Sequence, residues 1–204
     1  MRAVRSPRRL TRLADAAGLT LAEITVMLSV LSVVGAVITP AVGDYVNDAR
    51  LTKAQDDVRT LAMALNRLSF DVDIKPGSVL ATSTLMVGPG SVPDVGPGGD
   101  AAWTRPSGSE SVVELDDHLV SNRAGHTGRS SAGLLRRGWR GPYLDGPVSA
   151  DPWGRRYAVN LGAADHVVVV LSAGKNGVVE TAFSATEPTP GGDDIVALVN
   201  AGGL

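Results

Sequence analysis

The chain has 204 residues, of which 44% are hydrophobic and 20% charged, a balance that excludes a collagen, a coiled coil and a wholly disordered chain. Its net charge of −2 provides no basic face for phosphate groups, so no nucleic-acid partner is expected. Because the sequence has no cysteine, disulfide frameworks, thiolate zinc sites and cysteine nucleophiles are excluded. Its 24 glycines and 12 prolines fall mostly after residue 74 and predict a loop-rich second half.

A basic leader and a long apolar helix are predicted at the start of the chain. Residues 1–18 are rich in arginine, and residues 19–43 carry a single formal charge, Glu23. As a helix, the second segment is long enough to cross a bilayer, and the arginines orient it with the chain from Asp44 onward across the membrane. A secretory signal with a small-residue exit at 41–43 and a plain signal anchor are the alternatives.

Glu23 is the informative residue of this apolar helix. A carboxylate within a transmembrane segment costs about 2.5–3.5 kcal/mol on insertion scales, so it indicates a function and a partner. No lysine, arginine or histidine lies within one helical turn of Glu23. The expected partner is therefore a new α-amino group, made by cutting the chain just before Leu19. Later in the helix, Pro40 predicts a kink because proline removes a backbone hydrogen bond.

The sequence from Gly18 to Glu23, followed by an apolar helix with Pro40 in its last part, resembles the class III signal of type IV pilins and type II secretion pseudopilins. The resemblance implies that prepilin peptidase cuts after Gly18 and methylates the new amine of Leu19. It also implies that Glu23 supports the registration of subunits, and that the helix is a weak point at residues 35–40 in filaments.

Residues 44–70 become amphipathic, which predicts that the helix continues out of the membrane. Apolar side chains recur at steps of three and four residues: Val58, Leu61, Ala62, Leu65 and Leu68. Charged residues at the other positions, including Lys53 and Asp57 at helical spacing, are expected to form a solvated face.

Residues 71–137 are predicted to be a variable, loop-rich region. Turn-forming residues surround one apolar patch at 79–87, and residues 113–122 predict a short helix. The glycines of 88–99 lack the lysine and Ser/Thr of a phosphate-binding loop, so this stretch is expected to be a surface loop.

Residues 138–204 are expected to form a sheet with an aromatic core. The core aromatics gather within a short stretch: Trp139, Tyr143, Trp153 and Tyr157. The motif at 151–154 has the residue preferences of a type I turn. Strands are predicted at 156–160, where residues alternate, at 167–172, which suits burial on both faces, and at 195–199. The first two strands are expected to form a hairpin.

Four motifs of this region stand in the order seen in the major pseudopilin of type II secretion: residues 138–144, 151–154, 171–177 and 192–195. The resemblance covers residues 18–70 and 138–196 and leaves 71–137 unmatched. It implies an α+β, pilin-like lollipop, in which a long N-terminal helix, first transmembrane and then amphipathic, packs on a small antiparallel sheet with long loops.

The loop between residues 172 and 195 is the one candidate metal site. Carboxylate, amide and backbone carbonyl oxygens are ligands that calcium accepts, and the expected set is Leu171 through its carbonyl, Asn176, Asp193 and Asp194. The resemblance implies calcium binding in this loop. A solvated acidic loop without metal is the alternative.

Catalysis is not expected of this chain. His118, His126 and His166 occur without metal-ligand spacing, and no serine sits in a G-x-S-x-G turn. Each histidine is therefore interpreted as a surface or turn residue.

These observations predict a structural subunit, anchored by one helix in the inner membrane with its C-terminal domain in the periplasm and assembled into a pseudopilus for type II secretion. Its expected partners are copies of itself, minor pseudopilins, prepilin peptidase, the inner-membrane assembly platform and membrane lipid. The alternatives are a type IV pilin or minor pseudopilin, and a membrane-anchored periplasmic binding domain that does not polymerise.

Overall fold

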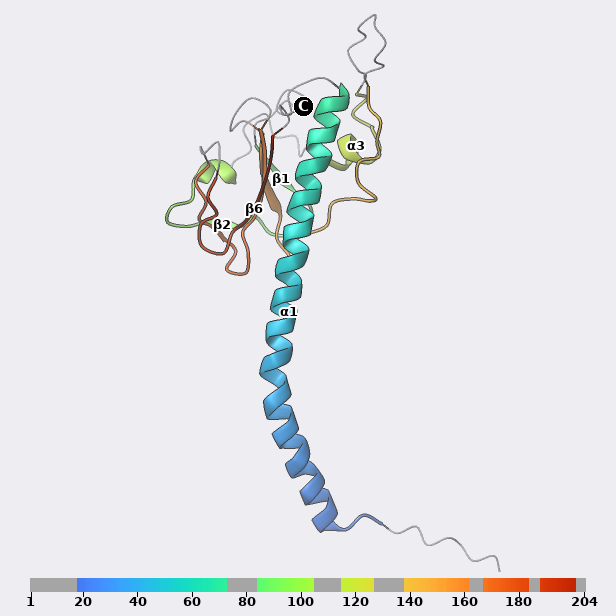
Figure 1. Ribbon diagram of the computed structural model, residues 1–204, viewed down its shortest axis with the longest axis vertical. Coiled ribbons are helices and arrows are strands. Elements are labelled where there is room, and N and C mark those ends of the chain that lie inside the picture. The colour runs from blue at the N-terminus through green and yellow to red at the C-terminus, as the bar shows by residue number, and fades with distance from the viewer. Residues whose placement is uncertain are drawn as a thin grey trace, which may run out of the picture. The chain divides into compact units, whose positions relative to one another are not determined.

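The computed structural model describes residues 18–72, 84–104, 115–126, 138–161, 167–183 and 188–200. Its elements follow in chain order: α1 (Leu21–Val72), β1 (Thr84–Val87), β2 (Asp94–Val95), η1 (Ala101–Trp103), α3 (Leu115–Leu119), β3 (Tyr157–Asn160), β4 (Val167–Ser172), β5 (Val178–Val179) and β6 (Ile195–Asn200) (Figure 1). The chain divides into two compact units, Met1–Tyr45 and Val46–Leu204. Helix α1 runs through the boundary between them, so the predicted continuation of the apolar helix is confirmed.

The N-terminal unit contains the apolar part of α1. The helix is continuous through Gly35, Pro40 and Gly43. It is the one helix in the described residues that is long and apolar enough to cross a membrane. None of the side chains described between residues 18 and 45 is buried.

The second unit is built on a four-stranded antiparallel sheet in the order β1-β3-β4-β6. Strand β4 pairs with β3, with Leu171 opposite Ala158, and with β6, with Val168 opposite Val199. The three predicted strands and the antiparallel pairing of β3 and β4 are therefore confirmed. Residues 162–166, which connect these two strands, lie outside the described residues.

The region of residues 71–137 contributes more to the fold than its sequence predicts. Strand β1 takes the end of the apolar patch into the sheet, where Leu85 lies opposite Val159. Strand β2 lies in the stretch expected to be a surface loop and pairs with β5 in parallel. The prediction that residues 88–99 form only a surface loop is therefore wrong. Helix α3 confirms the short helix expected within 113–122.

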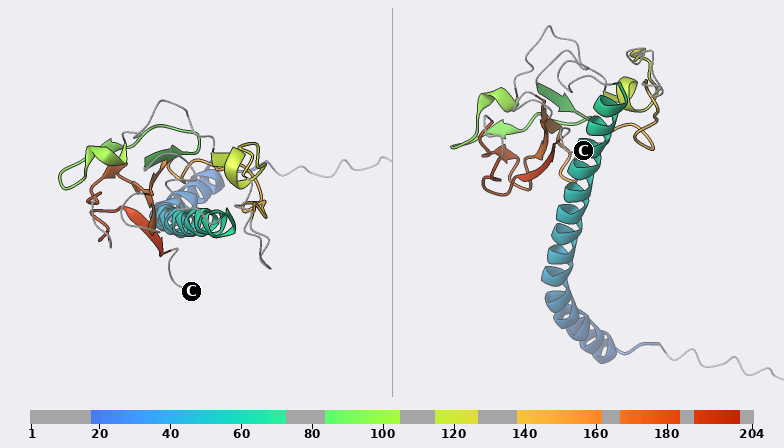
Figure 2. Two further views of the ribbon diagram at one scale, coloured as in Figure 1. Left: turned by 90° about the horizontal axis from the view of Figure 1, so that it is seen from above. Right: turned by 45° about the horizontal axis from the view of Figure 1, so that its top comes forward.

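Helix α1 packs its predicted apolar face against the sheet, as the two views of Figure 2 show. Every residue expected on that face is buried: Val58, Leu61, Ala62, Leu65 and Leu68. The alternate residues of β3 and β4 that join this cluster are Tyr157, Val159, Val168 and Val170. Because successive side chains of a strand point to opposite faces of the sheet, these residues all lie on one face, and α1 packs on that face.

A second cluster covers the opposite face of the sheet. The strand residues that it takes are Ala158, Val167, Val169 and Leu171. Trp103 of η1 packs among them, with its ring 5.1 Å from that of Phe183 in an edge-to-face arrangement. Because both faces are covered, all four residues of β3 are buried, although the sequence of 156–160 alternates.

The aromatic core differs in membership from the prediction. Of the four expected residues, only Tyr157 is fully buried, whereas Trp139, Tyr143 and Trp153 are partly buried against the cluster on the α1 side. Trp103, which was not among them, is 1% exposed and is the largest fully buried side chain in the described part of the chain.

Two tyrosines tie the sheet side of this unit to α1. The Tyr157 hydroxyl donates to Asp57 at 2.8 Å, and the Tyr143 hydroxyl donates to Asp71 at 2.8 Å. Burial raises the pKa of Tyr157, and the bond to Asp57 raises it further. Burial likewise raises the pKa of Tyr143 to about 12. Asp57 also forms the expected helical ion pair with Lys53 at 2.7 Å, and the bond from Tyr157 shows that Asp57 is more than part of a solvated face.

Candidate functional site

The predicted cleavage site lies immediately before α1. Gly18, Leu19 and Thr20 precede the first helical residue and are exposed. A Cβ atom built on Gly18 would meet no atom within 4 Å. In the described residues, therefore, no other part of the chain covers the bond between Gly18 and Leu19.

Glu23 is held at the start of α1 by a reciprocal capping arrangement. The Thr20 N–H and hydroxyl donate to Glu23 Oε2 at 2.9 and 2.8 Å, and the Glu23 N–H donates to Thr20 Oγ1 at 3.2 Å. This is a capping box, in which a Thr and a Glu three residues apart satisfy two free N–H groups of a helix start. The T-x-x-E spacing of residues 20–23 was a signal that could have revealed it.

The capping box corrects the expectation that the polar partner of Glu23 has to be a new α-amino group. The carboxylate has local hydrogen-bond donors, so cleavage is not needed to provide Glu23 with a polar partner. These hydrogen bonds do not neutralise its negative charge, and no lysine or arginine in the described residues forms an ion pair with it. A cation for Glu23 therefore still has to come from outside this set of residues.

Pro40 lies inside the continuous part of α1. Its own side chain is outside the described set. The predicted weak point at residues 35–40 stays a prediction.

The predicted turn at 151–154 organises the end of strand β4. The Gly154 N–H donates to the Asp151 carbonyl at 2.9 Å, which confirms the turn. The Asp151 carboxylate, only 4% exposed, accepts from two backbone N–H groups of the turn and from the Ser172 hydroxyl at 2.9 Å. Asp151 thereby joins the turn to the residue from which the candidate metal loop begins.

Arg155, which no motif of the sequence singles out, contacts this loop from outside it. Its Nη1 donates to the Gly174 carbonyl at 3.0 Å. A Cβ atom built on Gly177 would come within 2.1 Å of the guanidinium carbon, so the glycine makes room for the arginine. Gly177 also has a φ of +75°, which favours glycine. The loop at 174–177 is thus shaped around a positive charge.

Asp194 is the most buried acid of the candidate metal loop. One oxygen, Oδ2, accepts from the Glu180 N–H at 2.8 Å and from the Thr181 N–H and hydroxyl at 2.8 and 2.6 Å. The other oxygen, Oδ1, is buried and has no hydrogen-bond partner among the described residues. Burial raises the pKa of Asp194, although these hydrogen bonds lower it. An unpaired buried carboxylate oxygen is costly and marks a place where a cation would be favoured.

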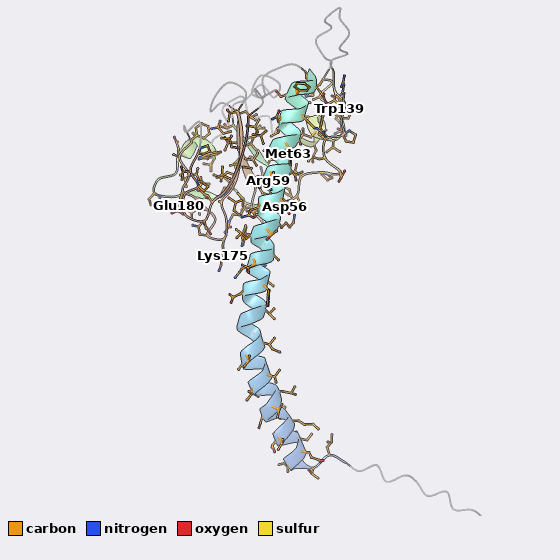
Figure 3. The ribbon with its side chains drawn as sticks, viewed as in Figure 1. Asp56, Arg59, Met63, Trp139, Lys175 and Glu180 are labelled. Atoms are coloured by element: carbon orange, nitrogen blue, oxygen red, sulfur yellow. The ribbon has the colours of Figure 1, made fainter. Side chains whose placement is uncertain are left out.

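The other predicted ligands form internal hydrogen bonds. Asp193 accepts from the Asn176 N–H at 2.9 Å. The Asn176 side-chain amide donates to the Glu180 carboxylate, and its oxygen accepts from the Val178 N–H. Figure 3 labels two residues of this loop, Lys175 and Glu180. Three of the four expected ligands are therefore brought together, while Leu171 lies within the ladder between β3 and β6. Across the described residues, no three Asp, Glu or His side chains are arranged to hold a metal ion.

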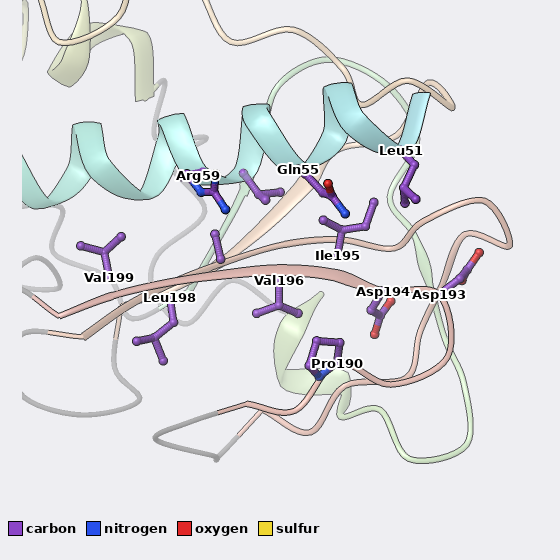
Figure 4. A pocket seen from close by; sticks show the side chains of 12 residues that line it. Leu51, Gln55, Arg59, Pro190, Asp193, Asp194, Ile195, Val196, Leu198 and Val199 are labelled. Carbon is purple, nitrogen blue, oxygen red and sulfur yellow. The ribbon is translucent and has the colours of Figure 1, made fainter. Parts of the chain in front are cut away.

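A groove of about 620 Å³ runs between α1 and β6, as Figure 4 shows. The helix contributes Leu51, Gln55 and Arg59 to its lining, and Asp193 and Asp194 also line it. Val58 of α1 lines it too, and the remaining residues of the lining are Pro190, Ile195, Val196, Ala197, Leu198 and Val199. The polar groups of this lining include two carboxylates, Asp193 and Asp194, and no histidine or serine.

Two of the three histidines do not behave as isolated surface residues. His118 and His126 are in contact, and both are partly buried. Their proximity depends on how the chain turns after α3, which the spacing of eight residues does not reveal. His166 lies outside the described residues.

The family model for protein G of the type II secretion system matches residues 127–187. This stretch is therefore similar to the type II secretion pseudopilin of that family. The matched stretch includes the Asp151 turn, β3, β4 and β5, and the first part of the candidate metal loop. No curated protein and no solved structure matches the chain.

The match over residues 127–187 bears out the predicted resemblance to type II secretion pseudopilins and supports a structural role. Protein G belongs to a structural secretion-system family, not to an enzyme family. The match ends before Asp193 and Asp194, so it says nothing about these two predicted ligands. It also begins after α1, whose relation to pseudopilins rests on residues 18–40 alone.

Proposed function

We propose that the chain is a pseudopilus subunit, matured by cleavage after Gly18 and polymerised in the periplasm through the apolar part of α1 for type II protein secretion. The observation that carries this proposal is the exposed apolar part of α1 before residue 46, in a chain of which residues 127–187 match a pseudopilin family. The match supports the role in secretion, and the helix supports both the single membrane span and the self-association.

The exposed apolar surface of the helix has to be shielded from water both in the membrane and outside it. Leu21 is 82% exposed and Val37 is 69% exposed, and they represent a segment that is apolar on all sides. In the membrane, lipid covers this surface, and helices gain little more than packing by meeting. Outside the bilayer, burial at about 25 cal/mol per Å² favours contact with the same helix of other copies. Removal from lipid thus drives assembly.

Glu23 provides the polar contact within this apolar association. Cleavage after Gly18 places the positive α-amine of Leu19 one residue before the capping Thr20. In a stack of helices, the amine of one subunit and the carboxylate of the next form a pair in surroundings of low dielectric constant. Breaking such a pair leaves an unpaired buried charge, so the axial step between subunits is fixed.

The proposed partners follow from the two stages, maturation in the membrane and assembly into the filament. Prepilin peptidase and membrane lipid act before assembly, and the inner-membrane assembly platform, minor pseudopilins and further copies of the chain act during it. This function has two alternatives. A type IV pilin or minor pseudopilin would occupy a different place in a filament. A membrane-anchored periplasmic binding domain would not polymerise.

Crosslinking in native membranes tests polymerisation directly. The chain has no cysteine, so cysteines introduced at Val26 and Val37, which are 63% and 69% exposed, are its only reactive thiols. With the peptidase and the assembly platform present, oxidation is expected to give a ladder of dimers, trimers and larger species. The same variant without peptidase is the control. Monomer alone under both conditions would indicate an anchored domain that does not polymerise.

We propose, in addition, that the loop at 172–195 binds calcium. The unpaired Oδ1 of Asp194 supports this, since Asp194, Asp193 and the nearby Glu180 are oxygen donors of the kind that calcium takes. Because the described residues form no ready cluster of three such groups, backbone carbonyls and water would complete the shell. Calcium would neutralise the acids and order the loop.

The melting temperature of the full-length chain in detergent tests calcium binding. Calcium is expected to raise it relative to chelator, because a ligand at about 100 times its Kd adds roughly 2.7 kcal/mol of stability. Asp194→Asn is expected to remove the response, and Asp145→Asn, at an exposed position, to keep it. Identical melting with calcium and with chelator would count against the site.

A further inference from the structure

The turn after α3 brings two imidazole rings into direct contact. His118 Nδ1 and His126 Nε2 lie 2.6 Å apart, and the ring centroids are 4.8 Å apart with a tilt of 43°. At this distance one nitrogen carries the hydrogen and the other presents its lone pair, because two lone pairs would repel each other. The position between the two nitrogens therefore holds one hydrogen, and a metal ion could take the place of that hydrogen.

The backbone on both sides of this pair is fixed. Asn122, with φ at +48°, accepts from the His126 N–H at 2.8 Å through its side-chain oxygen. The Trp139 indole N–H donates to the His118 carbonyl at 2.8 Å, and the Tyr143 N–H donates to the carbonyl of Leu119 at 2.7 Å. Hydrogen bonds from Asn122, Trp139 and Tyr143 thus hold the backbone that carries the two rings, in addition to the contact between the rings.

The surroundings of the pair favour neutral imidazoles. Burial lowers the pKa of His118 and of His126, and each positive ring would repel the other. Asp117, beside His118, opposes this effect on His118 but is itself bridged by Arg123 at 3.3 Å. Neutral imidazole is the form that binds metals.

We propose that His118 and His126 form a two-histidine site for a divalent transition metal, which takes the place of the shared hydrogen. Metal–nitrogen bonds of about 2.0–2.1 Å require the two rings to separate only slightly from their present contact. Imidazole suits zinc, nickel and copper, whereas carboxylate and carbonyl oxygens suit calcium, so this site and the loop around Asp194 select different ions. Water completes the coordination, because the described residues place no third ligand of this kind beside the pair.

Titration of the full-length chain in detergent with Cu²⁺, followed by electron paramagnetic resonance, tests this site. One Cu²⁺ per chain is expected, with hyperfine structure from two nitrogen ligands. His118→Asn and His126→Asn are each expected to weaken binding by about 10–100-fold, comparable to changes around other metal sites. His166→Asn serves as the matched control and is expected to bind as the unaltered chain does.

Two further measurements separate binding from folding. Melting of each variant without metal is expected to match the unaltered chain, which shows that loss of Cu²⁺ is not loss of structure. Binding to the unaltered chain is expected to weaken as the pH falls, because protons compete for the imidazoles, and excess Ca²⁺ is expected to displace no Cu²⁺. Equal binding by a variant that lacks both histidines, or a spectrum without nitrogen coupling, would overturn the proposal.

Discussion

Glu23→Gln is expected to abolish the crosslinked ladder while leaving the chain inserted in the membrane. Glutamine at this position of a capping box still accepts from the Thr20 N–H, so the helix start is preserved. What the substitution removes is the negative charge, and with it the pairing with an α-amine of Leu19. Membrane fractionation and crosslinking of the same samples separate the two effects.

Thr20→Val is the counterpart of this change. It removes the capping hydroxyl and keeps the charge, at a cost of about 0.5–2 kcal/mol to the helix end. Assembly is expected to persist in this variant. Asp44→Asn, at the other end of the apolar segment, controls for the loss of any acid and is expected to be neutral. A ladder from Glu23→Gln together with none from Thr20→Val would show that the cap, not the charge, matters.

Trp103→Ala is expected to destabilise the second unit by about 3–5 kcal/mol, the usual effect of removing a large buried aromatic side chain. Trp103 fills the cluster on the sheet face opposite α1, and its indole N–H donates to the Thr181 carbonyl at 2.8 Å. The loss therefore combines a cavity with an unpaired carbonyl. Chemical denaturation of the full-length chain in detergent measures the effect.

An exposed aromatic residue provides the control for this prediction. Phe70 is 66% exposed, so Phe70→Ala is expected to change the free energy of unfolding by less than about 0.5 kcal/mol. Trp103→Ala should also reduce any response to calcium, because Thr181 positions Asp194 through two hydrogen bonds. A cost below about 1 kcal/mol for Trp103→Ala would mean that η1 does not support the sheet.

The parts of the fold that the sequence predicts are those with long or uniform signals. The 52-residue helix has an uninterrupted apolar segment and then a regular apolar face, and β4 is a run of β-branched residues. Strands β1 and β2, of four and two residues, lie among glycines and prolines and are too short to show a period. Strand β1 forms because β3 offers it an edge of the main sheet, and β2 forms because it meets β5 in a separate two-stranded sheet.

The candidate sites divide in the same way. The cap formed by Thr20 and Glu23 is local, and its spacing was readable in advance. The placement of Arg155 over Gly177, the unpaired oxygen of Asp194 and the contact between His118 and His126 are tertiary features. No local pattern encodes them, because each depends on how separate turns meet.

The mass of the mature chain tests the proposed maturation and assembly most directly. The chain is extracted from membranes that contain prepilin peptidase and from crosslinked multimers, and its intact mass is measured in both. The expected N-terminus is Leu19 with one added methyl group in the two samples. Multimers built from chains that keep residues 1–18, or an N-terminus at Asp44, would contradict the proposal.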